Sequence, residues 1–418
     1  MKPWKTLTVT SLLALFASNA ISYDVVDRYK LIDDKLKTEQ MLRPYGHDFF
    51  LDVGAALNKN VTDFVDDVKK ANDFQGSDAA KLANAQAVLA KYDKTEQTVK
   101  LNVALGIPVF SFSIGQLKVQ PNIRVYADGG ANIGIRSETL TTAMVLDLIN
   151  VELPAELKAA VLAQAITPGG DILAPICPTL TDPGAVLICN ANIGKYFYPT
   201  DLNAPDMLLY AKIDGRVGLF NEYTYGEHYF GNWNLYALSR TDVFQRVNAN
   251  MIAKGSKVDL PAKKNTELAL QTDYRLGYKN SNYRVFASVE DLKLSQMKDR
   301  EAGSKELSYE YDPLMRIHAD ALYRFSAFSL NPFTGFHKRK GYGFADGLYL
   351  GADAGAHVWG DRLGLQLRGM FDKQYFTISP RMKLWIMQLE YSLKNPLKST
   401  DGDVKLSAIH SIDFRLFF

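Results

Sequence analysis

From about residue 98 to its end, the chain alternates apolar and polar side chains with a period of two. Between residues 209 and 219, Ile213 and Val217 fall on one face of an extended strand, while Lys212 and Asp214 fall on the other. This period is typical of β-strands whose two faces meet different surroundings. Similar runs, separated by turn residues, cover 268–278, 283–290, 315–326, 348–358, 362–371, 385–393 and 404–418, and less regular ones cover 98–114 and 121–137.

So many amphipathic strands in succession favour a barrel in lipid over a soluble sheet. Each strand of such a barrel spans the bilayer with about 9 to 11 residues, and its apolar face meets lipid while its polar face meets the lumen. Closure also satisfies every backbone hydrogen bond. The sequence therefore predicts an all-β transmembrane antiparallel barrel over residues 96–418, with about 12 strands and a possible range of 10–14.

Three segments interrupt this pattern. Residues 23–95 contain Val61, Phe64, Val65 and Val68 at helical spacing, which predicts a helical segment, either periplasmic or a plug in the lumen. Residues from about 140 to 205 have no strand pattern and predict a large insertion on one rim. Residues 229–250 fit either a strand pair or a helix. A barrel of this size has more lumen than side chains alone fill, so water or residues 24–95 would occupy it.

The first 22 residues predict a secretory signal peptide. Lys2 and Lys5 form a charged end, residues 7–17 an apolar centre, and Ser18, Ala20 and Ser22 supply small residues for cleavage. A membrane anchor would need about 20 apolar residues, and this run is too short for one. In an exported chain, the two cysteines, Cys177 and Cys189, predict a disulfide.

The charge balance argues against a nucleic-acid partner. The chain has 48 Lys and Arg against 46 Asp and Glu, and loss of Lys2 and Lys5 with the signal would leave 46 of each. Binding to a phosphate backbone calls for a basic excess. No metal cluster, nucleotide fingerprint or cofactor motif stands out, so no cofactor is expected.

The last residues carry a resemblance. Phe418, Leu416, Phe414 and Ile412 are apolar at alternating positions, although His410 departs from the pattern. This ending resembles the C-terminal assembly signal of bacterial outer-membrane β-barrels. The resemblance implies outer-membrane lipid and the barrel assembly machinery as partners, with Phe414, Leu416 and Phe418 as the signal. A final strand running toward the periplasm would place 279–282 on the inner side and the long connections outside, with the short 359–361 as an exception.

The layout resembles two families of such barrels. The alanine-rich helical region ahead of "TEQTVKLNVALGIPVF" resembles the TraF-like conjugal-transfer barrels. The length and the helical N-terminal segment are similar to those of fatty-acid-transporter barrels with a plugged lumen, although their Asn-Pro-Ala motif is absent. These resemblances imply either a channel or uptake protein for solutes, or a non-transporting barrel associated with interaction, secretion or conjugation.

Polar positions on the predicted strands give candidate lumen residues. His318 with Asp320, and His357 with Asp353, share a face, as a base and its orienting carboxylate do in hydrolases. No Ser or Cys nucleophile accompanies them, so we expect no enzyme. Inward bases modestly outnumber inward acids on these strands, chiefly through arginine, which favours anionic solutes. The predicted lumen residues are Arg216, Asp273, Arg275, Arg284, Arg316, His318, Asp320, Arg324, Asp353, His357, Arg362, Arg368 and Arg415.

Overall fold

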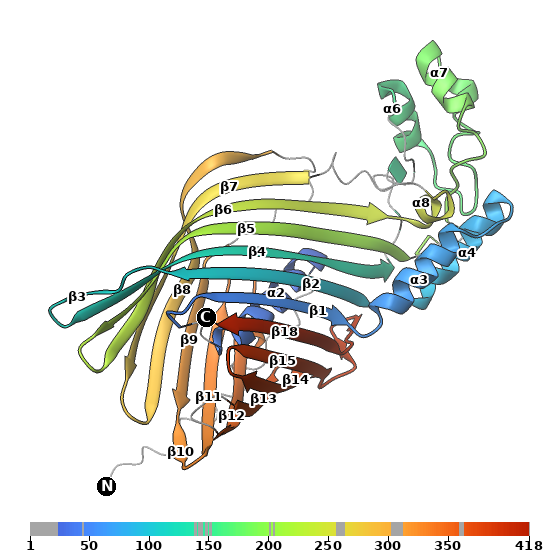
Figure 1. Ribbon diagram of the computed structural model, residues 1–418. Helices are drawn as coiled ribbons and strands as arrows, with labels where there is room; N and C mark the ends of the chain where they lie inside the picture. Colours follow the sequence, from blue (N-terminus) through green and yellow to red (C-terminus); the bar gives the residue numbers. More distant parts are fainter. Residues whose placement is uncertain are drawn as a thin grey trace, which may run out of the picture.

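The chain folds into a closed antiparallel β-barrel in a computed structural model (Figure 1). The structure describes residues 24–43, 46–137, 140, 145, 146, 149, 153–199, 202, 203, 205–255, 264–301, 312–358 and 363–417. Over these residues the wall has fourteen strands, because two of the sixteen strands in the sheet, β3 and β10, are short extensions. The prediction of an antiparallel barrel is confirmed, with fourteen strands instead of about twelve.

The wall strands differ in length, and those from β4 to β8 are the longest. The strands are β1 (Phe50–Asn58), β2 (Glu96–Pro108), β4 (Leu117–Ser137), β5 (Pro205–Tyr225), β6 (Tyr229–Val247), β7 (Lys264–Lys279), β8 (Tyr283–Glu301), β9 (Leu314–Ala321), β11 (Phe328–Lys338), β12 (Leu348–Val358), β13 (Leu363–Asp372), β14 (Tyr375–Leu384), β15 (Met387–Pro396) and β18 (Ile409–Phe417). The short strands are β3 (Phe112–Ile114), β10 (Tyr323–Phe325), β16 (Thr400–Asp401) and β17 (Val404–Lys405).

The helices lie before the barrel strands or between them. They are α2 (Val25–Met41), α3 (Val61–Asn72), α4 (Asp78–Lys91), α6 (Ala155–Ala163), α7 (Pro183–Asn190), α8 (Ala249–Ala253) and the 3₁₀ turns η2 (Cys177–Thr179) and η4 (Phe344–Gly347). Within the described ranges, no helix combines the length and apolarity that crossing a membrane requires.

The barrel begins inside the segment that the sequence predicted to be helical. Strand β1 pairs with β2 on one side and with the last strand, β18, on the other, from Phe50 opposite Phe417 to Asn58 opposite Ile409. The barrel boundary at residue 96 was therefore wrong, and residue 50 is the correct start. Helical spacing at residues 61–68 is real, but it belongs to α3 alone.

The period-two pattern does not predict two of the wall strands, and the structure decides the conformation of residues 229–250. Strands β11 and β14 each contain a proline, Pro332 and Pro380, which breaks the pattern. Residues 229–247 form the single strand β6, followed by α8 at 249–253. Omitting β14 reverses the expected directions of β12 and β13, which places residues 359–361 on the wrong side, and omitting β11 as well restores the direction of the earlier strands.

The short connections lie at one end of the barrel, except the two-residue turn 373–374 between β13 and β14, which lies at the other end. We call the end with the short connections the short-turn rim; it carries Phe50, the turns at 226–228, 280–282 and 385–386, and Phe417. Val358 pairs with Leu363 at the same end. The opposite end, the helical rim, carries α3, α4, α6, α7 and α8 (Figure 1). Residues 1–22 lie outside the described residues, so the predicted signal peptide stays a prediction.

The wall is polar inside and apolar outside. On β5 Lys212 and Asp214 are buried, while Ile213 between them is 66% exposed. A contiguous apolar surface far larger than a soluble monomer tolerates marks contact with a partner or a membrane. Exposed apolar residues on the strands include Val103, Leu101, Ile123, Val125, Val217, Leu219, Leu276, Ile317, Leu350, Leu365, Leu367 and Ile412.

Exposed aromatic side chains concentrate at the short-turn rim. Each lies within a few residues of a hairpin turn, as in the aromatic girdles of membrane barrels. They include Tyr225, Tyr229, Tyr283, Tyr323, Phe325, Phe328 and Trp385.

Helices α3 and α4 pack on the helical rim, outside the lumen. Phe64 of α3 and Leu89 of α4 are buried with Ile135 of β4, Val247 of β6 and Ile252 of α8. Phe64 and Val68 of the predicted apolar stripe therefore face the ends of the barrel strands, whereas Val65 is 51% exposed.

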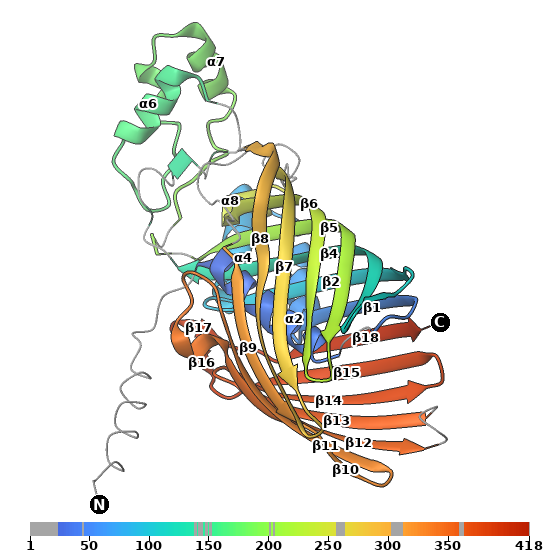
Figure 2. The same ribbon diagram turned by 90° about the vertical axis from the view of Figure 1, so that its left-hand side faces the viewer.

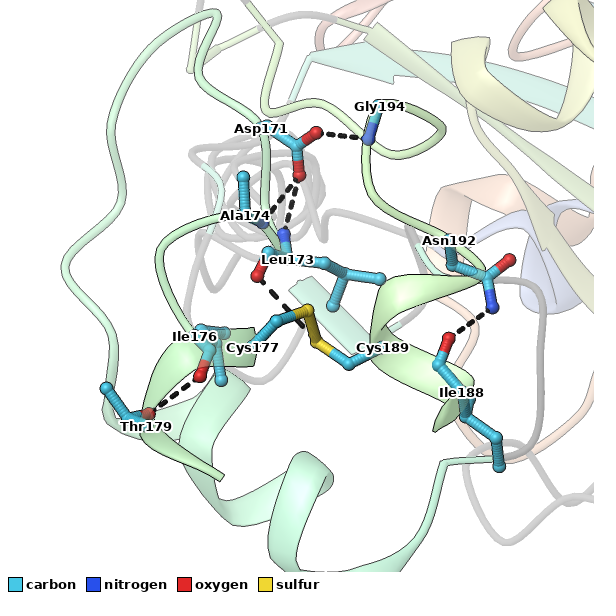
Figure 3. Close-up of a disulfide and its surroundings, with 10 residues drawn as sticks. All are labelled: Asp171, Leu173, Ala174, Ile176, Cys177, Thr179, Ile188, Cys189, Asn192 and Gly194. Carbon is cyan, nitrogen blue, oxygen red and sulfur yellow. Dashed lines mark hydrogen bonds between the residues drawn. A yellow bond between two sulfur atoms is a disulfide. The ribbon is translucent and has the colours of Figure 1, made fainter. Parts of the chain in front are cut away.

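Residues 153–199 form a small unit with a core of its own, which we call the rim unit (Figure 2). The predicted disulfide between Cys177 and Cys189 is present and buried there (Figure 3). Glu156 of α6 accepts hydrogen bonds from the backbone of Thr181 and Asp182, at 2.9 and 2.7 Å. These bonds, chiefly from Thr181, lower the pKa of the Glu156 carboxyl below its usual value.

Replacing both cysteines with alanine should loosen the rim unit and leave the barrel intact. The disulfide closes a loop with a sequence separation of 12, and a loop of about that size is worth roughly 3 kcal/mol. We expect limited proteolysis to cut within 153–199 much faster in the double variant, with an unchanged barrel fragment. Equal cleavage rates in the two forms would contradict this.

Candidate functional site

Helix α2 lies inside the barrel, surrounded by the inner faces of the strands (Figures 1 and 2). Asp24 caps its first turn by accepting a hydrogen bond from the Asp27 amide at 2.7 Å. Charged residues occur all round α2, yet 12 of its 17 residues are buried. Buried charges must be paired. The polar lumen wall supplies the partners, so α2 is a plug.

Asp33 faces the strands β2 and β5. Its carboxylate lies 2.8 Å from Lys37 of the same helix and 3.4 Å from Lys212 of β5, and it also contacts Lys100 of β2. Lys212 further contacts Asp214 at 2.9 Å. The side chains of Asp33, Lys100, Lys212 and Asp214 are all buried in the lumen. Their contacts fix the helix against this part of the wall.

Asp34 binds a different part of the wall. Arg339, after β11, donates to its two carboxylate oxygens at 2.7 and 2.9 Å, and the Tyr342 hydroxyl donates at 2.8 Å. Arg339 also contacts Asp291 of β8 at 2.5 Å. A two-pronged guanidinium to carboxylate contact is among the strong and geometrically specific ones.

Other charges of α2 bind further points on the wall. Lys35 contacts Asp372 of β13 at 2.7 Å, Arg28 contacts Glu96 of β2 at 2.5 Å, and Glu39 contacts Lys394 of β15. The plug is thus tied to the wall on several sides.

Three of the predicted lumen residues contact the last turn of the plug or the residues just after it. Arg316 donates to the Thr38 hydroxyl at 2.6 Å, Arg368 to the Glu39 carbonyl at 3.3 Å, and Arg415 to the Arg43 carbonyl at 3.0 Å. Cations near the C-terminus of a helix stabilise its macrodipole, and α2 has no basic residue in its last turn. The wall supplies these cations.

Gly130 of β4 makes room for the plug. The Tyr29 ring of α2 approaches Gly130 so closely that a Cβ there would overlap the Tyr29 hydroxyl. Gly130, within "YADGGANIGIR", therefore serves close packing.

A cavity of about 500 Å³ lies between the C-terminal half of α2 and the wall of β2 and β4 to β8, toward the short-turn rim. The predicted residues Arg216, Asp273, Arg275 and Arg284 line it. The alternation also places Asp214, Ser288 and Glu290 of this lining on polar strand faces without singling them out. Sequence reasoning missed other lining residues, among them Lys37, Arg43, Asn102, Arg124, Tyr126, Asp128, Phe220, Glu222, Phe230, Asn232 and Asn234.

Most charges in the cavity are paired. Arg124 contacts Glu222 at 3.3 Å, and Arg284 contacts Asp320, another predicted lumen residue, at 2.8 Å. Arg216 contacts Asp291 at 3.3 Å. The wall is therefore braced by ion pairs between strands, two of them between neighbours and one between β5 and β8.

The predicted His318 and Asp320 pair lies in an aromatic setting. His318 is buried, 3.2 Å from Asp320 and 3.0 Å from the Tyr349 hydroxyl, and its ring packs near Phe286 and Phe333. This arrangement stabilises the wall. Among the described residues, no group of three or more His, Cys, Asp or Glu is placed to hold a metal ion.

The remaining predicted residues divide as follows. Asp353 contacts Arg368 at 2.7 Å. The prediction that Arg324 lines the lumen is wrong. Arg324 lies on β10 at the short-turn rim, after the break in the strand at Leu322, where its side chain is exposed and outside the cavity lining. Phe414 and Leu416 lie in β18. Arg362, Phe418 and the His357 side chain lie outside the described residues.

Comparisons with known proteins give only distant likenesses. No family model matches the sequence, and no curated protein does. The transport unit of the autotransporter AIDA-I from Escherichia coli is 8% identical with a TM-score of 0.36, covering 95% of this chain and 99% of its own. The toluene transporter TbuX from Ralstonia pickettii is 10% identical with a TM-score of 0.31, covering 77% of this chain and 68% of its own.

A third likeness is of the same order. The toluene transporter TodX from P. putida is 9% identical with a TM-score of 0.31, covering 90% of this chain and 91% of its own. Because identities and TM-scores are this low, we infer no function from these three proteins.

Proposed function

We propose that this chain is a bacterial outer-membrane barrel that takes up or recognises a solute, with its lumen closed by α2, and that it is neither an enzyme nor an open pore. The observation that carries the proposal is the plug itself, whose charges bind strands from several sides of the lumen. The apolar exterior and the aromatic short-turn rim support placement in a bilayer.

Partners follow from the same proposal. Outer-membrane lipid would cover the exposed apolar strand positions, and the barrel assembly machinery would read the apolar alternation of β18. The lumen cavity would hold the solute.

A second function is favoured by one specific observation. The rim unit has its own core and disulfide beyond the barrel end, as expected of an interaction module in a secretion or conjugation barrel. This function predicts partners that bind the rim unit and are lost when residues 153–199 are deleted, with barrel assembly unchanged.

Planar-bilayer recording tests the plug. We expect the mature chain to conduct little and a chain lacking residues 24–43 to form stable, large channels, because the deletion removes α2 and leaves β1 in place. Heat-modifiable migration in gels checks that both barrels are folded. Equal, high conductance of the two forms would refute a closing role for α2, and equal, low conductance would favour the non-transporting alternative.

A further inference from the structure

We propose that the lumen cavity binds a small organic carboxylate, and that the guanidinium of Arg275 is the group that binds its carboxylate. The inference deepens the proposed function and rests on it for the physiological role of the site. Binding itself follows from the charges and surfaces of the cavity and is measurable without transport.

Arg275 projects from β7 into the cavity between two neutral neighbours. In the register of the sheet it lies opposite Asn232 of β6 and Ser288 of β8, both of which line the same cavity. Its guanidinium carbon is 4.4 Å from the ring centroid of Phe286. An arginine stacked on an aromatic ring keeps its planar edge free for a carboxylate.

The carboxylates that share the cavity with Arg275 are already bound to other groups. Asp273 accepts from Tyr236 at 2.9 Å and Asn234 at 3.1 Å, Glu290 contacts Arg316 at 3.1 Å, and Glu222 contacts Arg124 at 3.3 Å. None of these three described carboxylates forms an ion pair with Arg275.

Arg275 therefore stands apart from the other cavity arginines. Across the residues that the structure describes, it makes no ion pair, and its Nε is buried without a hydrogen-bond partner. Arg275 is half-buried, and a charge taken out of water without an ion pair is costly unless a group of opposite sign binds it. A carboxylate fits the two-pronged donor edge of a guanidinium.

The rest of the cavity favours an organic anion over a small inorganic one. Tyr126, Phe220 and Phe230 contribute aromatic surface to its lining. The cavity volume of about 500 Å³ is within the usual range for small-molecule sites, which combine apolar walls with a few placed polar groups. The carboxylate would meet Arg275 while an apolar ring meets these side chains.

Isothermal titration of the detergent-solubilised mature chain tests the site with three probes. Benzoate has both a carboxylate and an apolar ring, benzamide has the ring without the charge, and inorganic phosphate has charge without a ring. We expect benzoate to bind most tightly. Arg275→Gln should weaken benzoate binding by about tenfold or more, since it removes a charge-assisted pair, and Arg275→Lys should weaken it less. Arg324→Gln, the same change at an exposed arginine outside the cavity, should leave it unchanged.

Several results would overturn the inference. These are absence of benzoate binding, equal binding of benzamide or phosphate, or full benzoate affinity in a folded Arg275→Gln barrel. If the glutamine variant does not fold, Arg275→Lys decides, and unchanged affinity there overturns the role of Arg275. A chain that binds benzoate yet conducts freely would refute the closing role of α2 and leave the carboxylate site standing. A closed barrel that does not bind benzoate would refute the carboxylate site and leave the closing role of α2 standing.

Discussion

Asp34→Leu is expected to release helix α2 from the wall and open the lumen in a chain that still assembles. Arg339 donates to both oxygens of this buried carboxylate, and Tyr342 donates a third bond. Removing one partner of a buried ion pair typically costs about 3–5 kcal/mol, which raises the unplugged fraction by a factor of about 10² or more. Single-channel recording should show frequent large openings that the unchanged chain lacks.

Two companion variants make this result specific. Asp27→Asn, on the same helix, removes an i,i+3 pair with Lys30 at 3.4 Å whose carboxylate is 46% exposed, so openings should stay as rare as in the unchanged chain. Asp34→Leu combined with Arg339→Leu removes both charges, and Asp291 keeps its contact with Arg216 at 3.3 Å. The double variant should open less often than Asp34→Leu alone, since no buried charge is left behind. More frequent openings in the double variant would refute the role of this pair.

The period of two was enough to predict the barrel, because each wall strand places one face in a polar lumen and the other on the apolar exterior. Lys212, Ile213 and Asp214 on β5 show the rule at its clearest. It failed where strand residues are small or where proline interrupts. Strand β1 turns Gly54 and Ala56 inward, and β11 and β14 contain Pro332 and Pro380, so none of the three shows a continuous alternation.

The plug could not be read from periodicity at all. Helix α2 has charges on every side, and such a helix usually lies in solvent. What buries it is complementarity with residues far along the chain, as between Asp34 and Arg339 or Lys35 and Asp372. Alternation placed Arg316, Arg368 and Arg415 in the lumen, but it held no sign that they would contact the helix.

Residues 24–43 close the lumen and residues 50–58 close the sheet, and a pair of deletions should separate these two roles. Strand β1 joins the two ends of the sheet, and its register with β18 places Asp52 opposite Arg415, whose guanidinium contacts the Asp52 carboxylate at 2.6 Å. Deleting residues 24–43 removes the plug alone. Deleting residues 24–58 removes β1 as well and leaves β2 and β18 as unpaired edges in a wall of thirteen strands.

We expect the longer deletion to abolish the heat-modifiable, membrane-inserted form, and the shorter one to preserve it at near-normal yield. Open strand edges leave backbone groups unsatisfied in hydrocarbon, at several kcal/mol for each group, so the loss should be nearly complete. Gel migration without and with heating, together with membrane fractionation, measures both outcomes. A folded barrel at normal yield from the 24–58 deletion would mean that β2 closes directly on β18, and that β1 is dispensable for closure.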